Sequence, residues 1–227
     1  MALATYKDLC IDALDAVRLG HFWGAVLGLD FGLQENGDAC LTGPTPQHTI
    51  WINQVPEAKT VKHRVHLDIR SDAAALVEAQ GAAVLDATSF PWTLMADPEG
   101  GELCAFPLVD HQRPLASVVI DAVDHRRIAQ WWADVLGAEC VGDPRGFSSV
   151  TSIDGAPFDA IDFVPVPEAK TVKNRIHIDV LTSDLGALID AGATVLRPMA
   201  PPIRWTVLAD PEGNEFCAFN GTRATPA

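Results

Sequence analysis

Apolar and polar positions follow two different periods along this chain, and the two periods come in a fixed order. Residues 8–13 (DLCIDA) alternate polar and apolar, which is the two-residue period of a half-buried strand. From Leu19 onward, apolar side chains recur at i, i+3, i+4, i+7 and i+8, which is one face of a helix. Asp15 fits the N-cap of this helix and Gly28 its end. The pattern therefore predicts a strand followed by a helix.

Further strands are predicted after this helix, and then the order of elements starts again. Short β-like segments include 48–55. A new strand is expected at 64–69 (RVHLDI), followed by a helix that Gly81 ends. Two more strands flank DPEG at 97–100, where Pro at i+1 and Gly at i+3 suit a type I turn. Each half-copy thus reads as a strand, a helix and three strands.

The chain spells this whole pattern twice. Residues 55–68 (VPEAKTVKHRVHLD) and 166–179 (VPEAKTVKNRIHID) are identical at eleven of fourteen positions. Matching segments lie 109 to 113 residues apart throughout, which indicates two copies of one unit with small loop insertions. We divide the chain into a first domain at 1–112 and a second at 113–227, joined by a polar link that contains a proline.

The order of elements predicts the architecture of each copy. A strand–helix–three-strand module covers one face of its sheet with the helix and leaves the other face open. Two modules side by side can curl their open faces into a cup. We therefore expect an α+β protein, a tandem duplication in which each copy forms one cup from its own two modules, with the helices outside.

Composition and charge limit the classes of partner that this protein is expected to bind. The 227 residues are 48% apolar, yet no apolar run approaches the roughly 18 residues of a membrane span. The N-terminus lacks the features of a signal peptide, and the five cysteines are scattered without a CxxC pair, so we expect a reducing cytoplasm. A net charge of −14 disfavours nucleic acid and anionic membranes. A small-molecule ligand is expected, with the protein as monomer or homodimer.

Strand alternation assigns side chains to the open faces. In the first copy, the strands at 8–13, 64–70 and 102–106 present mainly polar and thiol groups there, with one phenylalanine: Asp8, Cys10, Asp12, Arg64, His66, Asp68, Arg70, Glu102, Cys104 and Phe106. The second copy presents the corresponding set: Ser117, Val119, Asp121, Arg175, His177, Asp179, Glu215, Cys217 and Phe219. So many ionisable groups on otherwise apolar strands need partners, a ligand or water.

These motifs together resemble the vicinal oxygen chelate superfamily. The resemblance rests on the paired modules, the helix FWGAVLG, the R-x-H-x-D strand and the hairpin around DPEG, and it covers nearly the whole chain twice. Glyoxalase-like proteins fit best, with glyoxalase I, fosfomycin- and bleomycin-resistance proteins and extradiol dioxygenases as relatives. The hairpin after a His strand and helix is a stronger signal for the fold than for any one reaction.

The resemblance implies a divalent metal, such as zinc, iron, manganese or nickel. Members of the superfamily typically take ligands from the first strand, the strand opening the second module, and the last strand. Carried over, these positions are Asp8, His66 and Cys104, and in the second copy Ser117, His177 and Cys217. Both cysteines stand where the family usually has Glu, which weakens the match. The set containing serine is the poorer one, because a hydroxyl is a weak ligand.

Acid–base catalysis without metal is an alternative. Histidine side chains ordinarily titrate near neutral pH, so His66 and His177 could carry a proton beside a carboxylate. The candidate catalytic groups are then His66, His177, Glu102, Glu215 and Asp12. Nucleophilic catalysis by Cys104 is disfavoured, because neighbouring carboxylates oppose a thiolate. His66 and Cys104 can also be read as ordinary buried residues, the histidine hydrogen-bonded and the thiol a small hydrophobe.

The remaining candidates are groups that would contact a ligand. Trp51, Trp92 and Trp205 could stack on a flat molecule, next to Cys104, Asp68, Cys217, Asp179 and Asp121. Lys59, Lys62 and Arg64, repeated in the second copy, could form a cationic rim, but neutralisation of local acids is the favoured reading. The functional hypotheses are a glyoxalase-like lyase, isomerase or dioxygenase, a non-catalytic binder of the bleomycin-resistance type, and a duplicated scaffold whose second cup supports the first.

Overall fold

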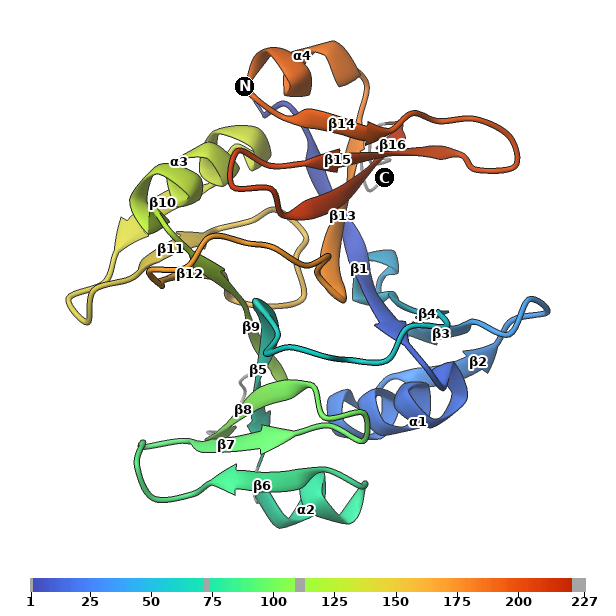
Figure 1. Ribbon diagram of the computed structural model, residues 1–227, viewed down its shortest axis with the longest axis vertical. Helices are drawn as coiled ribbons and strands as arrows, with labels where there is room; N and C mark the ends of the chain where they lie inside the picture. Colours follow the sequence, from blue (N-terminus) through green and yellow to red (C-terminus); the bar gives the residue numbers. More distant parts are fainter. Residues whose placement is uncertain (1, 72–73, 109–112, 222–227) are drawn as a thin grey trace.

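The computed structural model describes residues 2–71, 74–108 and 113–221, and within them four modules repeat one order of elements (Figure 1). The first module contains β1 (Thr5–Ala13), α1 (Ala16–Leu27), β2 (Asp30–Leu33), β3 (Ala39–Thr42), a short 3-10 turn η1 (Pro46–His48) and β4 (Ile50–Gln54). The second contains β5 (Val65–Ser71), α2 (Ala74–Ala79), β6 (Ala83–Asp86), β7 (Thr93–Ala96) and β8 (Glu102–Pro107).

The second copy repeats these elements. Its third module contains β9 (Leu115–Ala122), α3 (His125–Leu136), β10 (Glu139–Gly142), β11 (Ser148–Thr151) and β12 (Ala160–Pro165). The fourth contains β13 (Ile176–Thr182), α4 (Leu185–Asp190), β14 (Thr194–Arg197), β15 (Trp205–Ala209) and β16 (Glu215–Asn220). The predicted α+β architecture with strand–helix–three-strand modules is confirmed.

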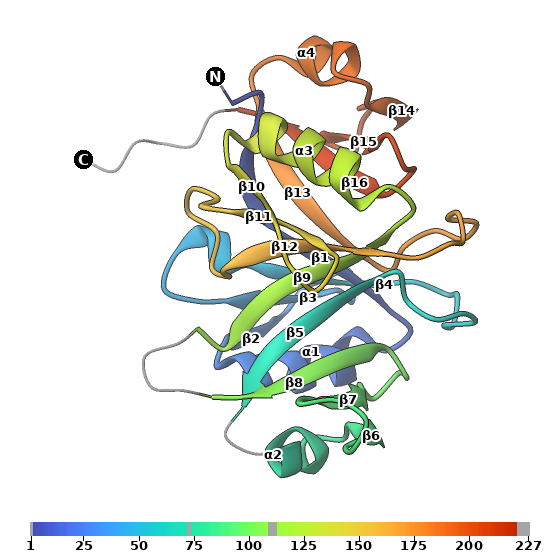
Figure 2. The ribbon, with the colours of Figure 1, turned by 90° about the vertical axis from the view of Figure 1, so that its left-hand side faces the viewer.

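The modules pair across the two copies, so the expectation that each copy forms its own cup is wrong. One eight-stranded sheet has the order β14-β15-β16-β13-β1-β4-β3-β2, and the other has β10-β11-β12-β9-β5-β8-β7-β6. Figures 1 and 2 show β1 beside β13 and β5 beside β9, both antiparallel pairs. Each sheet therefore joins one module of the first copy to one of the second. Because all four modules have the same hydrophobic periodicity, the sequence pattern does not indicate which modules share a sheet.

The long helices begin and end where the sequence predicts. The Asp15 carboxylate accepts a hydrogen bond from Arg18 N at 2.9 Å, and Gly28 ends α1 in the left-handed region at φ 67°. Asp124 and Gly137 do the same for α3. Trp23 and Trp132 on the apolar faces are only 1% exposed, as expected for core residues. None of the helices in the described part of the chain is long and apolar enough to cross a membrane.

Each hairpin around DPEG ties the two modules of one copy together. Gly100 N donates to Asp97 O at 2.9 Å, closing the turn. The Glu99 carboxylate then accepts hydrogen bonds from Leu14 N at 2.9 Å and Asp15 N at 2.7 Å, at the turn between β1 and α1. Glu212 binds the turn before α3 in the same way. Modules of one copy are therefore joined by hairpins, and modules of different copies by strands.

The repeated stretches at 55–64 and 166–175 lie between the sheets, and we call them the crossovers. Arg64 Nη1 donates to Glu168 O at 2.7 Å, and Arg175 Nη1 donates to Glu57 O at 2.6 Å, so each crossover holds the other. Lys62 pairs with Asp121 and Lys173 with Asp12, again between copies. These reciprocal contacts give a structural reason for the near identity of the two stretches.

Candidate functional site

The open faces of the two sheets carry the candidate chemistry, and we call them cup A (β1, β4, β13, β16) and cup B (β9, β12, β5, β8). The predicted metal set of Asp8, His66 and Cys104 is not one site. Asp8 on β1 is opposite Asp179 of β13, whereas His66 and Cys104 belong to the other sheet. Because modules pair across copies, Asp8 joins the histidine of the second copy, and Ser117 joins that of the first.

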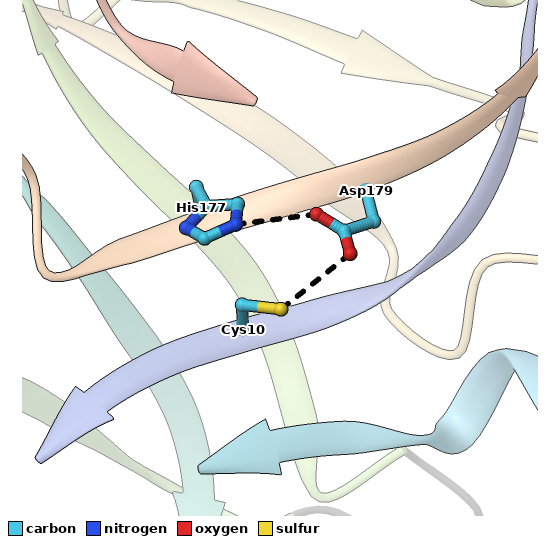
Figure 3. Close-up of side chains that lie close together, drawn as sticks. All are labelled: Cys10, His177 and Asp179. Atoms are coloured by element: carbon cyan, nitrogen blue, oxygen red, sulfur yellow. Dashed lines mark hydrogen bonds and ion pairs between the residues drawn. The ribbon is translucent and has the colours of Figure 1, made fainter. Parts of the chain in front are cut away.

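In cup A, a thiol and an imidazole flank one buried carboxylate (Figure 3). The two-residue period of β13 puts His177 and Asp179 on the same face, where His177 Nε2 lies 3.2 Å from Asp179 Oδ1. Cys10 Sγ, from β1, lies 3.5 Å from Asp179 Oδ2. Cys217 Sγ, from β16, lies 3.4 Å from His177 Nε2. The side chains of Asp179 and His177 are only 2% and 9% exposed.

Asp8 extends this cluster. Its carboxylate pairs with Lys7 and accepts a hydrogen bond from Trp51 Nε1 at 3.3 Å. Burial, followed by the nearby charge of Asp179, raises the pKa of Asp8 to about 6, although Lys7 and Trp51 oppose the shift. Asp8 Oδ1 is buried and has no hydrogen-bond donor. Cup A thus holds two carboxylates that compete for few positive groups.

Cup B repeats the histidine, aspartate and thiol of cup A, and its side chains are more exposed to solvent. His66 Nε2 lies 3.5 Å from Asp68 Oδ1 and 3.8 Å from Cys104 Sγ. Ser117 is opposite Asp68, and Val119 is opposite His66, in the places that Asp8 and Cys10 hold in cup A. The side chains of His66 and Asp68 are each 15% exposed.

Asp162 on β12 is a residue of cup B that our reading of the sequence did not single out. Ser149 Oγ donates to Asp162 Oδ1 at 2.5 Å, and the strand register places Asp162 in one row with Val119 and His66. Burial raises the pKa of Asp162, while hydrogen bonds from Ser149 and Ser117 oppose the shift. Its signal was the alternation within FDAIDFVPV, where Asp162 stands between two buried apolar residues.

The other predicted carboxylates are held by the crossovers. Glu102 accepts from Lys59 Nζ at 2.9 Å and from His63 N at 3.0 Å, and Glu215 accepts from Lys170 Nζ at 2.6 Å. Asp12 and Asp121 pair with Lys173 and Lys62, as described above. These four acids, predicted as catalytic or ligand-binding groups, have cationic partners, and the lysines neutralise local acids as favoured from the sequence.

Aromatic side chains line both cups. Trp92 stacks on Phe90 with ring centroids 5.1 Å apart and lies 5.2 Å from Phe106. Trp205 stacks on Phe219 at 5.3 Å, and Lys7 Nζ lies 4.2 Å from the centroid of the Phe219 ring. Trp51, Trp92 and Trp205 are all half-buried. The predicted aromatic groups therefore sit on strands or loops beside the cups.

A family model described as "Glyoxalase-like domain" matches residues 8–106 and again residues 117–219. The chain belongs to this family. A comparison with curated proteins finds no match. Glyoxalase-like folds of the vicinal oxygen chelate superfamily, in two tandem domains, thus account for nearly the whole chain, as predicted.

Solved structures share this fold at low sequence identity. Glyoxalase I from Zea mays is 14% identical with a TM-score of 0.73, over 96% of this chain and 92% of that one. A putative dioxygenase from Bacillus subtilis is 13% identical with a TM-score of 0.62, over 98% of this chain and 87% of that one. At these identities the likeness shows the fold alone.

The geometry of this glyoxalase-like protein argues against a cysteine nucleophile. In each cup the same histidine nitrogen, Nε2, faces both the aspartate and the thiol, whereas Nδ1 of His66 and His177 is buried without a partner. A thiol–imidazole–carboxylate relay needs the two nitrogens to serve different groups. Burial also raises the pKa of Cys104 to about 12. The thiols therefore stay protonated unless a cation binds them.

Both clusters fit a metal ion. Cys10, His177 and Asp179 offer donor atoms within 4.8 Å of one another, and so do His66, Asp68 and Cys104. Asp8 Oδ1 is buried without a hydrogen-bond donor, and Oδ1 of Asp68 and of Asp179 meets the imidazole Nε2 of the neighbouring histidine at 3.5 and 3.2 Å without a well-formed hydrogen bond. Buried carboxylate oxygens need a compensating positive group, and zinc accepts thiolate, imidazole and carboxylate together. The donor set and the unpartnered oxygens therefore suit a divalent cation such as zinc.

A separate cavity of about 820 Å³ lies between the crossovers. Its lining includes His63, Lys62 and Lys173 but neither His66 nor His177. Because Lys62 and Lys173 are paired with Asp121 and Asp12, the cavity offers less uncompensated charge than the cups. The candidate chemistry is therefore assigned to the cups.

Proposed function

We propose that this protein is a glyoxalase-like enzyme of lyase, isomerase or dioxygenase type that acts on a small molecule with the help of a divalent metal. The observation that carries the proposal is the convergence of imidazole, carboxylate and thiol donor atoms within 4.8 Å of one another in each cup.

The residues have distinct roles in this proposal. His177, Asp179 and Cys10 would hold a metal in one cup, and His66, Asp68 and Cys104 would hold one in the other. When bound, the metal would supply a Lewis acid that polarises oxygen atoms of the substrate. Asp162, buried beside the cup B cluster, is suited to accept a proton or a hydrogen bond from substrate, because burial favours its protonated form.

The aromatic walls would orient the substrate. Trp92, between Phe90 and Phe106, presents a flat apolar surface next to Cys104. Its indole N–H opposes part of the rise that burial causes in the pKa of Cys104. Such a wall excludes water and favours a ligand with a flat apolar part. The same surface supports a second candidate function, sequestration of a flat small molecule without turnover.

Metal content of tag-free protein tests the proposal. We expect two equivalents of zinc or another divalent metal per chain after saturation and removal of excess. His66→Ala and His177→Ala should each lose one equivalent, because each removes the nitrogen around which a cluster is arranged. His125→Ala is the matched control, since His125 binds Ser148 outside the cups, and it should keep both equivalents.

Two outcomes would oppose the metal enzyme. Protein that stays metal-free after exposure to zinc, iron, manganese and nickel would overturn the metal role. If such protein still binds flat organic molecules, with quenching of tryptophan fluorescence that Trp92→Leu abolishes, sequestration is the better account.

A further inference from the structure

We propose that cup B recognises an amino group of its substrate, in the place where cup A holds the ammonium group of its own Lys7. The inference starts from one difference between the cups, because the counterpart of Lys7 in the second copy is Ala116. It rests on the proposed function in that it names a substrate class for cup B, and it does not require the metal.

Lys7 points into cup A because of a bulge in β1. The pairing of β1 with β13 slips by one residue between Tyr6 and Asp8, which leaves Lys7 as the extra residue. The Lys7 ammonium pairs with the Asp8 carboxylate and lies 4.2 Å from the centroid of the Phe219 ring. A carboxylate beside an aromatic face forms a site for a cation, and in cup A the chain fills this site itself.

Cup B keeps the frame of this site without the lysine. The pairing of β9 with β5 slips at the corresponding place, where Ala116 is the extra residue. The ring centroids of Phe106 and Trp92 lie 5.2 Å apart with an interplanar angle of 33°, and those of Phe219 and Trp205 lie 5.3 Å apart at 30°. The aromatic pair is therefore the same in both cups, and in cup B a methyl group replaces the lysine side chain.

The carboxylate is also kept, although it comes from another strand. Asp162 on β12 accepts hydrogen bonds from Ser149 and Ser117, and Ser117 stands where cup A has Asp8. The Asp162 carboxylate thus reaches the strand position from which Asp8 binds Lys7. Burial raises the pKa of Asp162, so a positive partner would stabilise its ionised form.

No lysine or arginine in the described ranges pairs with Asp162 or lies over the aromatic pair of cup B. Arg70 of β5 pairs with Asp159 instead. Arg145, whose charge acts on Asp162 from a distance, pairs with Asp143. Cup B therefore presents a carboxylate and an aromatic face without a cation of its own, which suits an ammonium group of a ligand.

The complementary ligand is a primary or secondary amine with a flat apolar part. Its ammonium would lie over Phe106 and donate to Asp162, and its apolar part would lie along Trp92. Cup A is not expected to take this group, because Lys7 already occupies the corresponding place.

Binding of three matched probes to the full chain tests the inference. Phenethylamine carries an ammonium group at neutral pH, phenethyl alcohol is uncharged, and hydrocinnamate carries a carboxylate, while all three share one aromatic ring. We expect calorimetry to show one equivalent of the amine, bound at least about tenfold more tightly than the alcohol, because the alcohol lacks both the charge-assisted hydrogen bond and the cation–π contact. Hydrocinnamate should bind more weakly than the alcohol.

Exchanges between the cups locate the bound amine. Ala116→Lys copies cup A and should remove the preference for the amine, because the new ammonium fills the site. Lys7→Ala copies cup B and should add a second equivalent of amine. Asp162→Asn should remove the preference while leaving the affinity for the alcohol unchanged, and it keeps the test open if the lysine variant does not fold. Asp134→Asn is the matched control, because Asp134 binds Gln130 on α3 outside the cups, and it should keep the preference.

The outcomes separate this inference from the metal role. If the amine binds no more tightly than the alcohol, or if its preference survives both Ala116→Lys and Asp162→Asn, the inference is overturned whatever the metal content. A Lys7→Ala protein that still binds one equivalent would overturn the equivalence of the two sites. If the protein takes up no metal but loses the amine preference in these variants, the metal role fails and the recognition of an amine in cup B stands.

Discussion

Each cup is built from two modules, and the two cups are alike in the residues of one module and different in those of the other. The strands from the second and fourth modules give both cups the same histidine, aspartate and cysteine. The strands from the first and third modules differ: cup A pairs the Asp8 carboxylate with the Trp51 N–H, whereas cup B pairs Ser117 and Ser149 with the Asp162 carboxylate. In cup A the carboxylate is on β1 and its hydrogen-bond donor Trp51 is on β4. In cup B the carboxylate is on β12, the counterpart of β4, and the donor Ser117 is on β9, the counterpart of β1.

This exchange shows how a duplicated chain can diversify its sites. Each cup keeps one further carboxylate near the histidine cluster, so the charge of the pair is retained while its position changes. Because modules pair across copies, every cup receives one constant module and one variable module. Substitutions in the first copy therefore fall in cup A when they lie on β1 or β4 and in cup B when they lie on β5 or β8.

Separating the copies should have the largest effect on this arrangement. The fragment 1–112 contains β1–β4 and β5–β8, whose partners β13 and β9 lie in the other half. We expect it to be unfolded or self-associated as expressed alone, because each half-sheet leaves an apolar edge strand unpaired. Mixed with 113–227 at equal concentration, it should form a folded one-to-one complex, measured by circular dichroism and light scattering. A monomeric, cooperatively folding 1–112 would contradict the pairing.

Local structure was largely predictable from the sequence because its causes are local. The Asp15 and Asp124 caps, the glycines after both long helices and the turn at 97–100 each depend on a few adjacent residues. Pairing of modules depends on contacts between strands over 100 residues apart, such as Asp8 with Asp179. Four modules with one pattern gave no local reason to prefer either pairing.

The candidate site divides in the same way. Strand alternation put His66 beside Asp68 and His177 beside Asp179 on one face, and the structure agrees. Glu102 could not be recognised as a crossover anchor, because its partner Lys59 is 43 residues away in the chain. Asp162 was missed because its strand was read only as β-like and its faces were not assigned.

The two hairpins offer a second comparison, with an intermediate expected effect. In the second copy, Asn214 donates to Asp210 and accepts from Asn174 at 3.0 Å. In the first copy these asparagines are Gly101 and His63, and a Cβ on Gly101 would lie 2.5 Å from Asp97 Oδ2 and 2.9 Å from the His63 ring. We expect Gly101→Asn alone to lower the free energy of unfolding by about 1–3 kcal/mol through crowding.

Adding His63→Asn should rescue the protein. The pair would copy the second hairpin, so a double-mutant cycle from urea unfolding should give a favourable coupling of about 0.5–3 kcal/mol. Burial raises the folded-state pKa of Asp97 from 3.8 to about 6, so the wild-type protein loses stability as the pH rises from about 4 through 6. An amide at position 101 donates to this carboxylate and should flatten that loss. Additive effects, or an unchanged pH profile, would contradict the comparison.

The smallest effect is expected at the crossovers, where the two copies agree most. Lys62 pairs with Asp121 and Lys173 with Asp12, and the lysine side chains are 62% and 60% exposed. The carboxylates are only 9% and 8% exposed, but each lysine amine reaches water, where ion pairs contribute about 0–1 kcal/mol and salt screens them. Lys62→Ala and Lys173→Ala should therefore each lower the free energy of unfolding by about 1 kcal/mol or less, and by equal amounts that shrink in high salt. Unequal losses of unfolding free energy in urea titrations would contradict this expectation. They would mean that the two crossovers, despite their shared sequence, contribute differently to stability.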